Sequence, residues 1–320
     1  MRWTKRSGVV VAALALAVGL GFAPAASAAP LPVDHNFLAG IPAELANPGG
    51  SLPGSNDYGC KPSPEHPNPV VLVHGTAGSQ QTNWISLVPA LKNEGYCVFA
   101  LTYGELSPQW ALSRIGGLGD KTISAWQLKL FVDNVLAKTG AEKVDIVGHS
   151  QGTQIPTYWA KYYGGARHID KYVSLAPFWQ GSDGDGQGRS DLIAMFADAL
   201  GLPPAAVPQT DCPDCVAAPN DDDFAAAIDA PNGPYVEGIT YTNIATRYDQ
   251  LVTPYTSGIL AGPAGIEVTN IVVQDTCSLD RSDHLSIVAN QRTEAMVLNA
   301  LDPQHPRPVP CLAVPPYTGA

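Results

Sequence analysis

The chain is 320 residues long, 45% of them apolar and 15% charged, and carries a formal net charge of −11 at pH 7. An acidic surface argues against nucleic acid as a partner and against electrostatic attachment to anionic lipid headgroups. Any attraction to a lipid surface would therefore have to be apolar, and we expect a monomer.

The first 28 residues have the pattern of a cleaved secretory leader. Three cationic residues among the first six precede an almost wholly apolar run, residues 9–22, and small residues at 26–28 suit a signal peptidase. The apolar run is too short for a stable membrane span. We expect a secreted, extracellular protein without a transmembrane anchor, whose mature chain, residues 29–320, forms a single α/β domain with a net charge of −14.

All six cysteines fall in the mature part, and in an exported chain an even count indicates disulfides. Their order along the chain favours Cys60–Cys97, Cys212–Cys215 and Cys277–Cys311. The Cys212-x-x-Cys215 spacing could instead form a redox pair, but its proline-rich surroundings favour a structural clip. Zinc is not expected there, because the sequence offers no further Cys or His ligands nearby.

Apolar runs alternate with helical spacing along the rest of the chain, which predicts a mostly parallel sheet with helices on both faces. Residues 29–69, rich in Pro, Gly and Asn, predict an extended lead-in. The predicted strands are residues 70–73, 97–103, 144–147, 172–175, 241–245 and 268–273. The predicted helices are residues 84–93, 122–138, 151–163 and 285–301. In the second of these, Ile123, Trp126, Leu130 and Val135 fall near one face, and Gly140 ends the helix.

An insertion of about sixty residues, roughly 180–238, interrupts this alternation between two predicted strands. It is rich in Gly, Pro and Asp, and its first helical piece, residues 191–200, is amphipathic. An insertion at the C-terminal edge of a sheet is where a lid or a pocket wall would lie. A helix that caps the core is the alternative, and both remain open.

The strongest chemical signal is Gly148-His149-Ser150-Gln151-Gly152. It follows a predicted strand directly and opens a helix, which is the strand–turn–helix context of a nucleophile elbow. The glycines allow a tight turn around the serine, and the N-terminal amides of the helix would face a developing oxyanion. The motif therefore predicts that Ser150 is a catalytic nucleophile rather than part of a surface loop.

A serine nucleophile needs a base and an acid that orients it, in the chain order serine, acid, histidine. His284 lies between the last predicted strand and the last helix, whereas His305 lies in a proline-rich tail and His168 at the opposite end of the sheet. Asp249 follows the predicted strand 241–245 and is the favoured acid. Its rivals are Asp275, Asp280 and Asp283 on the histidine's own loop and, more weakly, Asp183 and Asp185.

An oxyanion hole needs two hydrogen-bond donors. One is predicted to be the backbone N–H of Gln151, and the other that of Thr76 in the loop after the first strand. We interpret His74 as a brace for that loop. His149 is expected to line the substrate pocket.

Four motifs in this order resemble the secreted class 2 lipases of actinobacteria and, more distantly, the fungal lipase-B type. They are Val70–Gly75 with Thr76, the 148–152 elbow, Tyr248-Asp249-x-x-Val252-x-Pro254-Tyr255 and Asp283-His284-Leu285. The resemblance implies an α/β-hydrolase fold with Ser150, Asp249 and His284 as the triad and Thr76 and Gln151 as oxyanion donors. It also implies that Phe178 and Trp179 form an acyl-pocket wall. The fungal type has Asp at the position of Phe178 and Trp at that of His149.

These observations predict a serine hydrolase of carboxylic esters, most simply of lipids, that needs neither a cofactor nor a metal. The alternatives within enzymes are a short-chain esterase and a polyester hydrolase. A non-catalytic secreted binding protein on the same scaffold and a thiol oxidoreductase built on Cys212 and Cys215 belong to other classes.

Overall fold

The computed structural model describes residues 1, 3, 29–105, 114–181, 222–231 and 233–319. The chain divides into two units, residues 1–30 and 31–320, and the fold below is that of the second unit. No helix in the described part of the chain is long and apolar enough to span a bilayer. Most of the predicted leader and residues 182–221 of the predicted insertion lie outside the described residues, as do Asp183, Asp185, Cys212 and Cys215.

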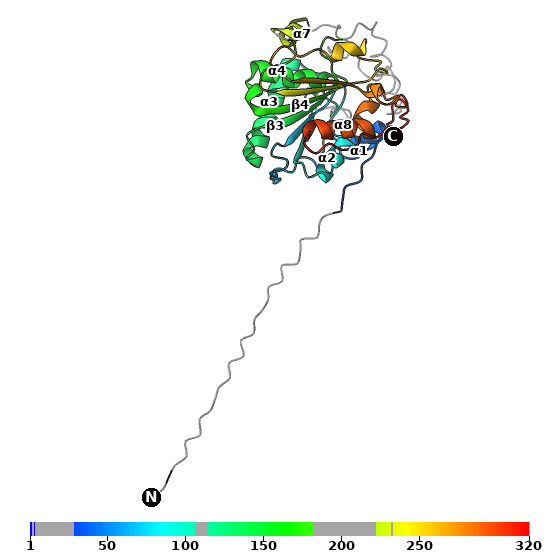
Figure 1. Cartoon of the computed structure of the whole chain (residues 1–320). Helices are drawn as coiled ribbons and strands as arrows, with labels where there is room; N and C mark the ends of the chain where they lie inside the picture. The colour runs from blue at the N-terminus through cyan, green and yellow to red at the C-terminus, as the bar shows by residue number, and fades with distance from the viewer. Residues whose placement is uncertain (2, 4–28, 106–113, 182–221, 232, 320) are drawn as a thin grey trace. The chain divides into compact units, whose positions relative to one another are not determined.

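A six-stranded, wholly parallel sheet forms the centre of the fold, as the alternation of apolar and helical segments predicted (Figure 1). Its spatial order is β2-β1-β3-β4-β5-β6. The strands are β1 (Val70–Val73), β2 (Val98–Leu101), β3 (Val144–His149), β4 (Ile169–Leu175), β5 (Thr240–Ala245) and β6 (Val268–Val272). The chain winds outward from β1 in both directions, so the carboxyl ends of all strands lie at one edge.

The described α-helices are α1 (Gly40–Ala46), α2 (Leu87–Asn93), α3 (Lys121–Thr139), α4 (Gln154–Tyr162), α7 (Asp222–Asp229) and α8 (Gln291–Leu301). Short 3-10 turns are η1 (Phe37–Ala39), η2 (Ser150–Thr153), η3 (Gly165–His168), η5 (Tyr255–Gly258), η6 (Val273–Asp275) and η7 (Ser286–Ala289). The predicted closing helix is therefore divided into η7 and α8. The division falls at Asn290, whose side chain accepts a hydrogen bond from Arg292 N.

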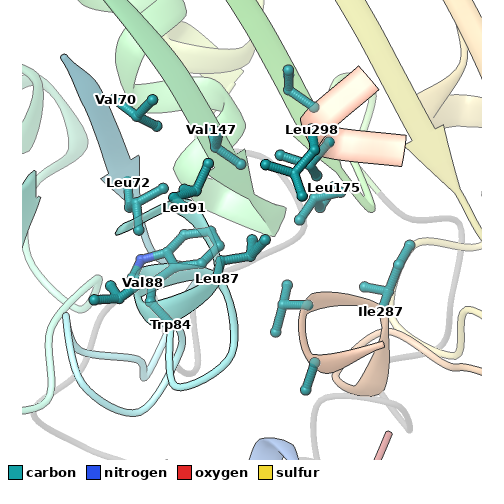
Figure 2. Packing of buried hydrophobic residues seen from close by; sticks show 14 of the residues in the cluster. Val70, Leu72, Trp84, Leu87, Val88, Leu91, Val147, Leu175, Ile287 and Leu298 are labelled. Carbon is teal, nitrogen blue, oxygen red and sulfur yellow. The ribbon is translucent and has the colours of Figure 1, made fainter. Parts of the chain in front are cut away.

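Two apolar cores cover the two faces of the sheet, because successive residues of a strand point to opposite sides. Val70 and Leu72 of β1 pack toward α2 and α8, whereas Val71 and Val73 pack toward α3 and α4. Figure 2 shows the first core, in which Trp84 and the apolar side chains of α2 lie beneath the strands. Both faces are thus buried, which explains the continuous apolar run of β1.

The lead-in corrects one prediction, because residues 37–46 form η1 and α1 rather than extended chain. Asn36 accepts a hydrogen bond from Leu38 N and so starts the turn. Phe37 and Ile41 are buried. Burial of these two side chains stabilises a helical segment that the proline- and glycine-rich composition of the lead-in did not predict.

Helix α3 runs where it was predicted, from the cap at Asp120 to a left-handed Gly140, but its buried face is different. Ala125, Leu128, Val132 and Val135 are fully buried. Three apolar residues that set the predicted face are exposed, namely Ile123, Trp126 and Leu130. Two apolar stripes compete on this helix, and contact with the sheet decides which one is covered.

Candidate functional site

The turn between β3 and η2 has the geometry of a nucleophile elbow. Ser150 has a φ of 53°, in the left-handed region that side-chain-bearing residues rarely adopt. A Cβ at Gly148 would lie 2.5 Å from Gly152 O, and a Cβ at Gly152 would lie 2.1 Å from Val73 O. Neither position can hold a side chain without moving backbone. The two glycines of the motif are therefore steric requirements of the turn.

Asp249 and His284 are brought together, although 35 residues separate them. His284 Nδ1 lies 2.9 Å from both carboxylate oxygens of Asp249, and both side chains are buried. Leu251 N and Val252 N donate to Asp249 Oδ1 at 2.9 and 2.7 Å, which orients the carboxylate. Because a carboxylate only accepts, Nδ1 carries the imidazole proton and Nε2 is left as the basic nitrogen.

His149 connects the nucleophile turn to the loop that carries His284. Its Nε2–H donates to His284 O at 2.8 Å, and the two imidazole rings lie 4.9 Å apart. Its Nδ1 lies 3.0 Å from the side-chain oxygen of Asn83, and that oxygen accepts a hydrogen bond from Gly75 N at 3.3 Å. Within the described residues no hydrogen bond joins Ser150 to the His284 ring. The contacts of His149 therefore link the turn that carries Ser150 to the loop that carries His284.

His149 is thus held through its Nε2 by the His284 carbonyl, and its side chain is buried. Burial, reinforced by the neighbouring His284, lowers the pKa of His149 well below its ordinary value. A neutral imidazole with its proton on Nε2 satisfies the His284 carbonyl. The expected contact of His149 with substrate stays a prediction.

The loop after β1 passes directly against Ser150. A Cβ at Gly75 would lie 3.1 Å from the Ser150 Cβ, so a side chain there would crowd the serine. Thr76 follows, half-buried, and the backbone of Gly117 packs against it. The predicted oxyanion donors Thr76 and Gln151 therefore come from two segments that meet beside Ser150.

His74 braces this loop in its neutral form. Its Nδ1–H donates to Gly75 O at 2.7 Å, and Tyr103 N donates to its Nε2 at 3.2 Å. The His74 ring also stacks on Tyr103, with centroids 4.3 Å apart. Burial lowers the pKa of His74 to about 4, in keeping with a ring that donates through one nitrogen and accepts through the other.

Tyr103 connects His74 to the nucleophile elbow at residues 148–152. Its hydroxyl lies 2.7 Å from His74 O and 3.1 Å from Gln151 Oε1, within hydrogen-bond distance of both. Together with Asn83, it is a residue of the site that the motifs did not identify. Neither belongs to a local pattern, and only their contacts with His74 and His149 mark them.

The segment after β4 is held to the turn that follows Ser150. Thr153 Oγ1 donates to Ser150 O at 2.7 Å and accepts from Phe178 N at 3.1 Å. Gln154 Nε2 donates to Phe178 O at 2.6 Å. Phe178 is half-buried and Trp179 is buried, and both line a pocket next to α4 and α7. Their contact with substrate stays a prediction.

The rival carboxylates have other partners. Asp283 is buried and accepts from Leu285 N and Ser286 N, so it organises the turn that carries His284. Asp280 is also buried and accepts from Asn290 Nδ2 at 2.7 Å. Asp275 is exposed and pairs with Arg247. Among the described residues, no three His, Cys, Asp or Glu side chains cluster in a way that could hold a metal ion.

Two disulfides join the pairs that chain order predicted. Cys60 is bonded to Cys97, and Cys277 is bonded to Cys311. The first attaches the lead-in to the residue before β2. The second attaches the C-terminal tail to the loop between β6 and His284.

Sequence comparison relates one segment of the chain to lipases. Residues 67–177 match the family described as lipase (class 2). Over 97 residues the chain is 35% identical to a triacylglycerol lipase of Pseudarthrobacter phenanthrenivorans, covering 29% of this chain and 28% of that protein. A triacylglycerol lipase of Burkholderia plantarii matches equally well, over 25% of its length. The match thus spans about a quarter of the length of these relatives.

Solved structures with the same fold include two lipases. Aspergillus fumigatus lipase B aligns with a TM-score of 0.59 and 18% identity, over 81% of this chain and 57% of that one. The mature form of a Bacillus licheniformis lipase aligns with a TM-score of 0.51 and 18% identity, over 80% of this chain and 99% of that one. At such identity the likeness concerns the fold. The chain thus has the α/β-hydrolase fold, and its residues 67–177, which include the 74–78 loop and the elbow, are similar to the class 2 lipases.

Proposed function

We propose that the chain is a secreted serine hydrolase of carboxylic esters and acts as a lipase on triacylglycerols. The observation that carries the proposal is the buried Asp249–His284 pair, whose loop is hydrogen-bonded to His149, the residue before a serine with a positive φ. The similarity of residues 67–177 to the class 2 lipases favours lipid esters as substrates. Two disulfides favour an oxidising, extracellular compartment.

The mechanism is acyl transfer in two steps. Ser150 Oγ attacks the ester carbonyl carbon while His284 Nε2 accepts the hydroxyl proton, and Asp249 stabilises the imidazolium that forms. The N–H groups of Gln151 and Thr76 stabilise the oxyanion of the tetrahedral intermediate. The imidazolium then donates its proton to the leaving alcohol. Water attacks the acyl-enzyme by the same route and releases the acid.

The proposal predicts that Ser150→Ala and Asp249→Asn both abolish ester cleavage without unfolding the chain. Removing the acid of a triad lowers kcat by about 10⁴-fold, because the histidine loses its tautomer and orientation. Turnover of p-nitrophenyl esters and circular dichroism measure activity and folding. Ser63→Ala, a serine outside the site, is the control and should keep wild-type turnover. Near wild-type turnover by Ser150→Ala would refute the proposal.

The variant Asp283→Asn tests whether Asp249 or its rival Asp283 is the acid of the triad. Because Asp283 accepts hydrogen bonds within the turn that carries His284, we expect the variant to lose stability but to keep far more activity than Asp249→Asn. The opposite ranking of kcat would assign the acid's role to Asp283.

A panel of esters with acyl chains from C2 to C18, together with a polyester film, tests the substrate class. A lipase should cleave long-chain esters and gain rate once substrate exceeds its solubility. Activity confined to short chains would indicate an esterase, and erosion of the film a polyester hydrolase. Failure of a fluorophosphonate to label Ser150 would instead indicate a non-catalytic binding protein.

A further inference from the structure

The main chain of His284, the proposed base, is held on both sides by side chains that adjoin the other two residues of the proposed triad. Its N–H donates to Gln250 Oε1 at 3.2 Å, and Gln250 is the residue after Asp249. Its carbonyl oxygen accepts from His149 Nε2 at 2.8 Å, and His149 is the residue before Ser150. The loops of the acid and of the nucleophile therefore each contribute one side chain that binds the His284 backbone.

The side-chain amide of Gln250 has a single orientation that satisfies both of its contacts. Its Oε1 must accept from His284 N, so its Nε2 faces Asp283 Oδ2 at 3.4 Å and donates to it. The opposite orientation would place the amide oxygen against a carboxylate and the NH2 group against an N–H. Asp283 also accepts from Leu285 N and Ser286 N. Gln250 therefore connects the loop of the acid to the turn that carries the base.

Gln274 offers a matched comparison, because its hydrogen bonds within the described residues go to the loop of the acid and not to His284. Its Oε1 accepts from Arg247 N and its Nε2 donates to Thr246 Oγ1, both at 2.9 Å. Gln274 and Gln250 are both half-buried, and each amide makes two hydrogen bonds. The two glutamines thus differ chiefly in whether they bind the main chain of the base.

The orientation of the His284 backbone matters because the imidazole Nε2 must reach the serine hydroxyl. A general base has to lie within about 2.6–3.2 Å of the group whose proton it takes, and a misplacement of about 1 Å can lower the rate about 100-fold. The hydrogen bond between His284 Nδ1 and Asp249 fixes one end of the ring, but the ring can still pivot about that bond. Hydrogen bonds to the N–H and to the carbonyl oxygen of His284 restrict its φ and ψ, and so fix the direction in which Cβ carries the ring.

We propose that Gln250 and His149 are positioning residues, which together hold the His284 backbone in the orientation that catalysis needs. Gln250 sets the base relative to the acid, and His149 sets it relative to the nucleophile. Neither side chain takes part in proton transfer. The inference rests on the proposed ester hydrolase function and extends its machinery beyond the triad and the oxyanion donors.

Three glutamine variants test the side of the acid. Gln250→Met removes both hydrogen bonds at similar length, and kcat per active site should fall by about ten- to 100-fold with little change in KM. Gln250→Glu keeps the oxygen that accepts from His284 N but replaces the NH2 group that faces Asp283 with a second oxygen. It should therefore lose stability and yet keep more of kcat than Gln250→Met. The matched control Gln274→Met should lose stability and keep kcat.

Three measurements give these quantities. Turnover of p-nitrophenyl butyrate is measured on the alkaline plateau of each variant's pH profile, where the His284 imidazole is neutral in every variant. Titration with a fluorophosphonate counts the active sites, and urea unfolding gives the stability.

His149→Leu tests the side of the nucleophile, and its combination with Gln250→Met tests whether the two residues act together. The variant leaves the His284 carbonyl without its donor, so kcat should fall, and His149→Gln, which again offers an N–H donor, should recover part of the loss. Residues that act as a unit have non-additive effects, so the double variant should lose far less than the product of the two single losses. No hydrogen bond joins Gln250 to His149 in the described part of the chain, so such coupling indicates an effect through the base that both hold.

The outcomes separate this inference from the hydrolase function itself. If the wild type cleaves esters but Gln250→Met loses no more kcat per active site than Gln274→Met, or if Gln250→Glu is the less active Gln250 variant, the positioning role is refuted and the hydrolase stands. Losses that multiply in the double variant would refute a shared action on His284. If the wild type cleaves no ester, the hydrolase is refuted, and this inference with it. Gln250 is half-buried whereas His149 is buried, so the Gln250 variants decide the test if His149→Leu fails to fold.

Discussion

Asp145 shows how a single buried carboxylate makes the stability of the fold depend on pH. It lies on β3, accepts from Lys171 N at 3.0 Å and from Asn68 Nδ2 at 3.2 Å, and has Lys171 Nζ 3.9 Å from its other oxygen. Burial raises the pKa of Asp145 to about 6, and the Lys171 ammonium offsets only part of that effect. The native state therefore keeps a proton on Asp145 at pH values where the unfolded chain has lost it.

The sign of the pH effect follows from this difference. A raised carboxyl pKa favours the native state at low pH, and that contribution is lost as pH rises from about 4 to about 6. The quantity to compare is the unfolding free energy at pH 7 minus that at pH 4. We predict that this difference is more positive in Asp145→Asn than in the wild type by up to about 3 kcal/mol. Urea unfolding at both pH values measures this.

His74 acts with the opposite sign in the same range, because its pKa is lowered to about 4. Its contribution is present in the wild type and in Asp145→Asn, so it cancels in the comparison between them. An unchanged pH slope in Asp145→Asn would mean that Asp145 ionises in the native state as readily as in the unfolded chain.

At the scale of one element, α3 shows that an apolar residue in a helical pattern is not always buried. Leu128 is fully buried against the sheet, and Leu130, two residues later, is 52% exposed. We predict that Leu128→Ala lowers the unfolding free energy by about 2–5 kcal/mol, because it removes packed atoms and leaves a cavity. Leu130→Ala should change it by less than about 0.5 kcal/mol.

Urea unfolding of the two variants checks this prediction directly, since each loses the same atoms from the same helix. Equal losses of stability would place Leu130 at a covered surface. A loss confined to Leu130→Ala would mean that the helix presents the stripe of Ile123, Trp126 and Leu130 to the sheet.

At the scale of the whole molecule, the two disulfides close loops of similar length but hold different parts. The bonded residues are 37 positions apart in Cys60–Cys97 and 34 apart in Cys277–Cys311. The second pair also fixes the tail against the loop that carries His284. Arg281 N donates to Val314 O at 3.1 Å, and Tyr317 N donates to Asp283 Oδ2 at 2.9 Å.

We predict that replacing either pair with serine lowers the unfolding free energy by about 3–4 kcal/mol, because the unfolded chain regains the freedom of a long loop. Only the Cys277/Cys311 double variant should also lower kcat per folded molecule, since it frees the tail from the His284 loop. Guanidinium unfolding and active-site titration measure the two effects. Equal kcat in both double variants would show that the tail does not position His284.

The sequence alone determined the features that depend on neighbours along the chain. Continuous apolar runs such as residues 70–73 predict strands buried on both faces, and the 148–152 motif predicts a turn that only glycine permits on each side of the serine. Chain order predicted the pairing of Asp249 with His284 over closer rivals. These predictions succeed because local sterics and the direction of parallel strands leave few alternatives.

Only the tertiary structure decided which groups meet across the fold. It covers one of two apolar stripes on α3, turns part of the lead-in into α1, and places Asn83 and Tyr103 under the two histidines of the site. Such contacts join residues with no spacing in common, and burial of a side chain depends on which surface arrives opposite it. The physical reason is that packing is settled through space, where the order of residues along the chain carries little information.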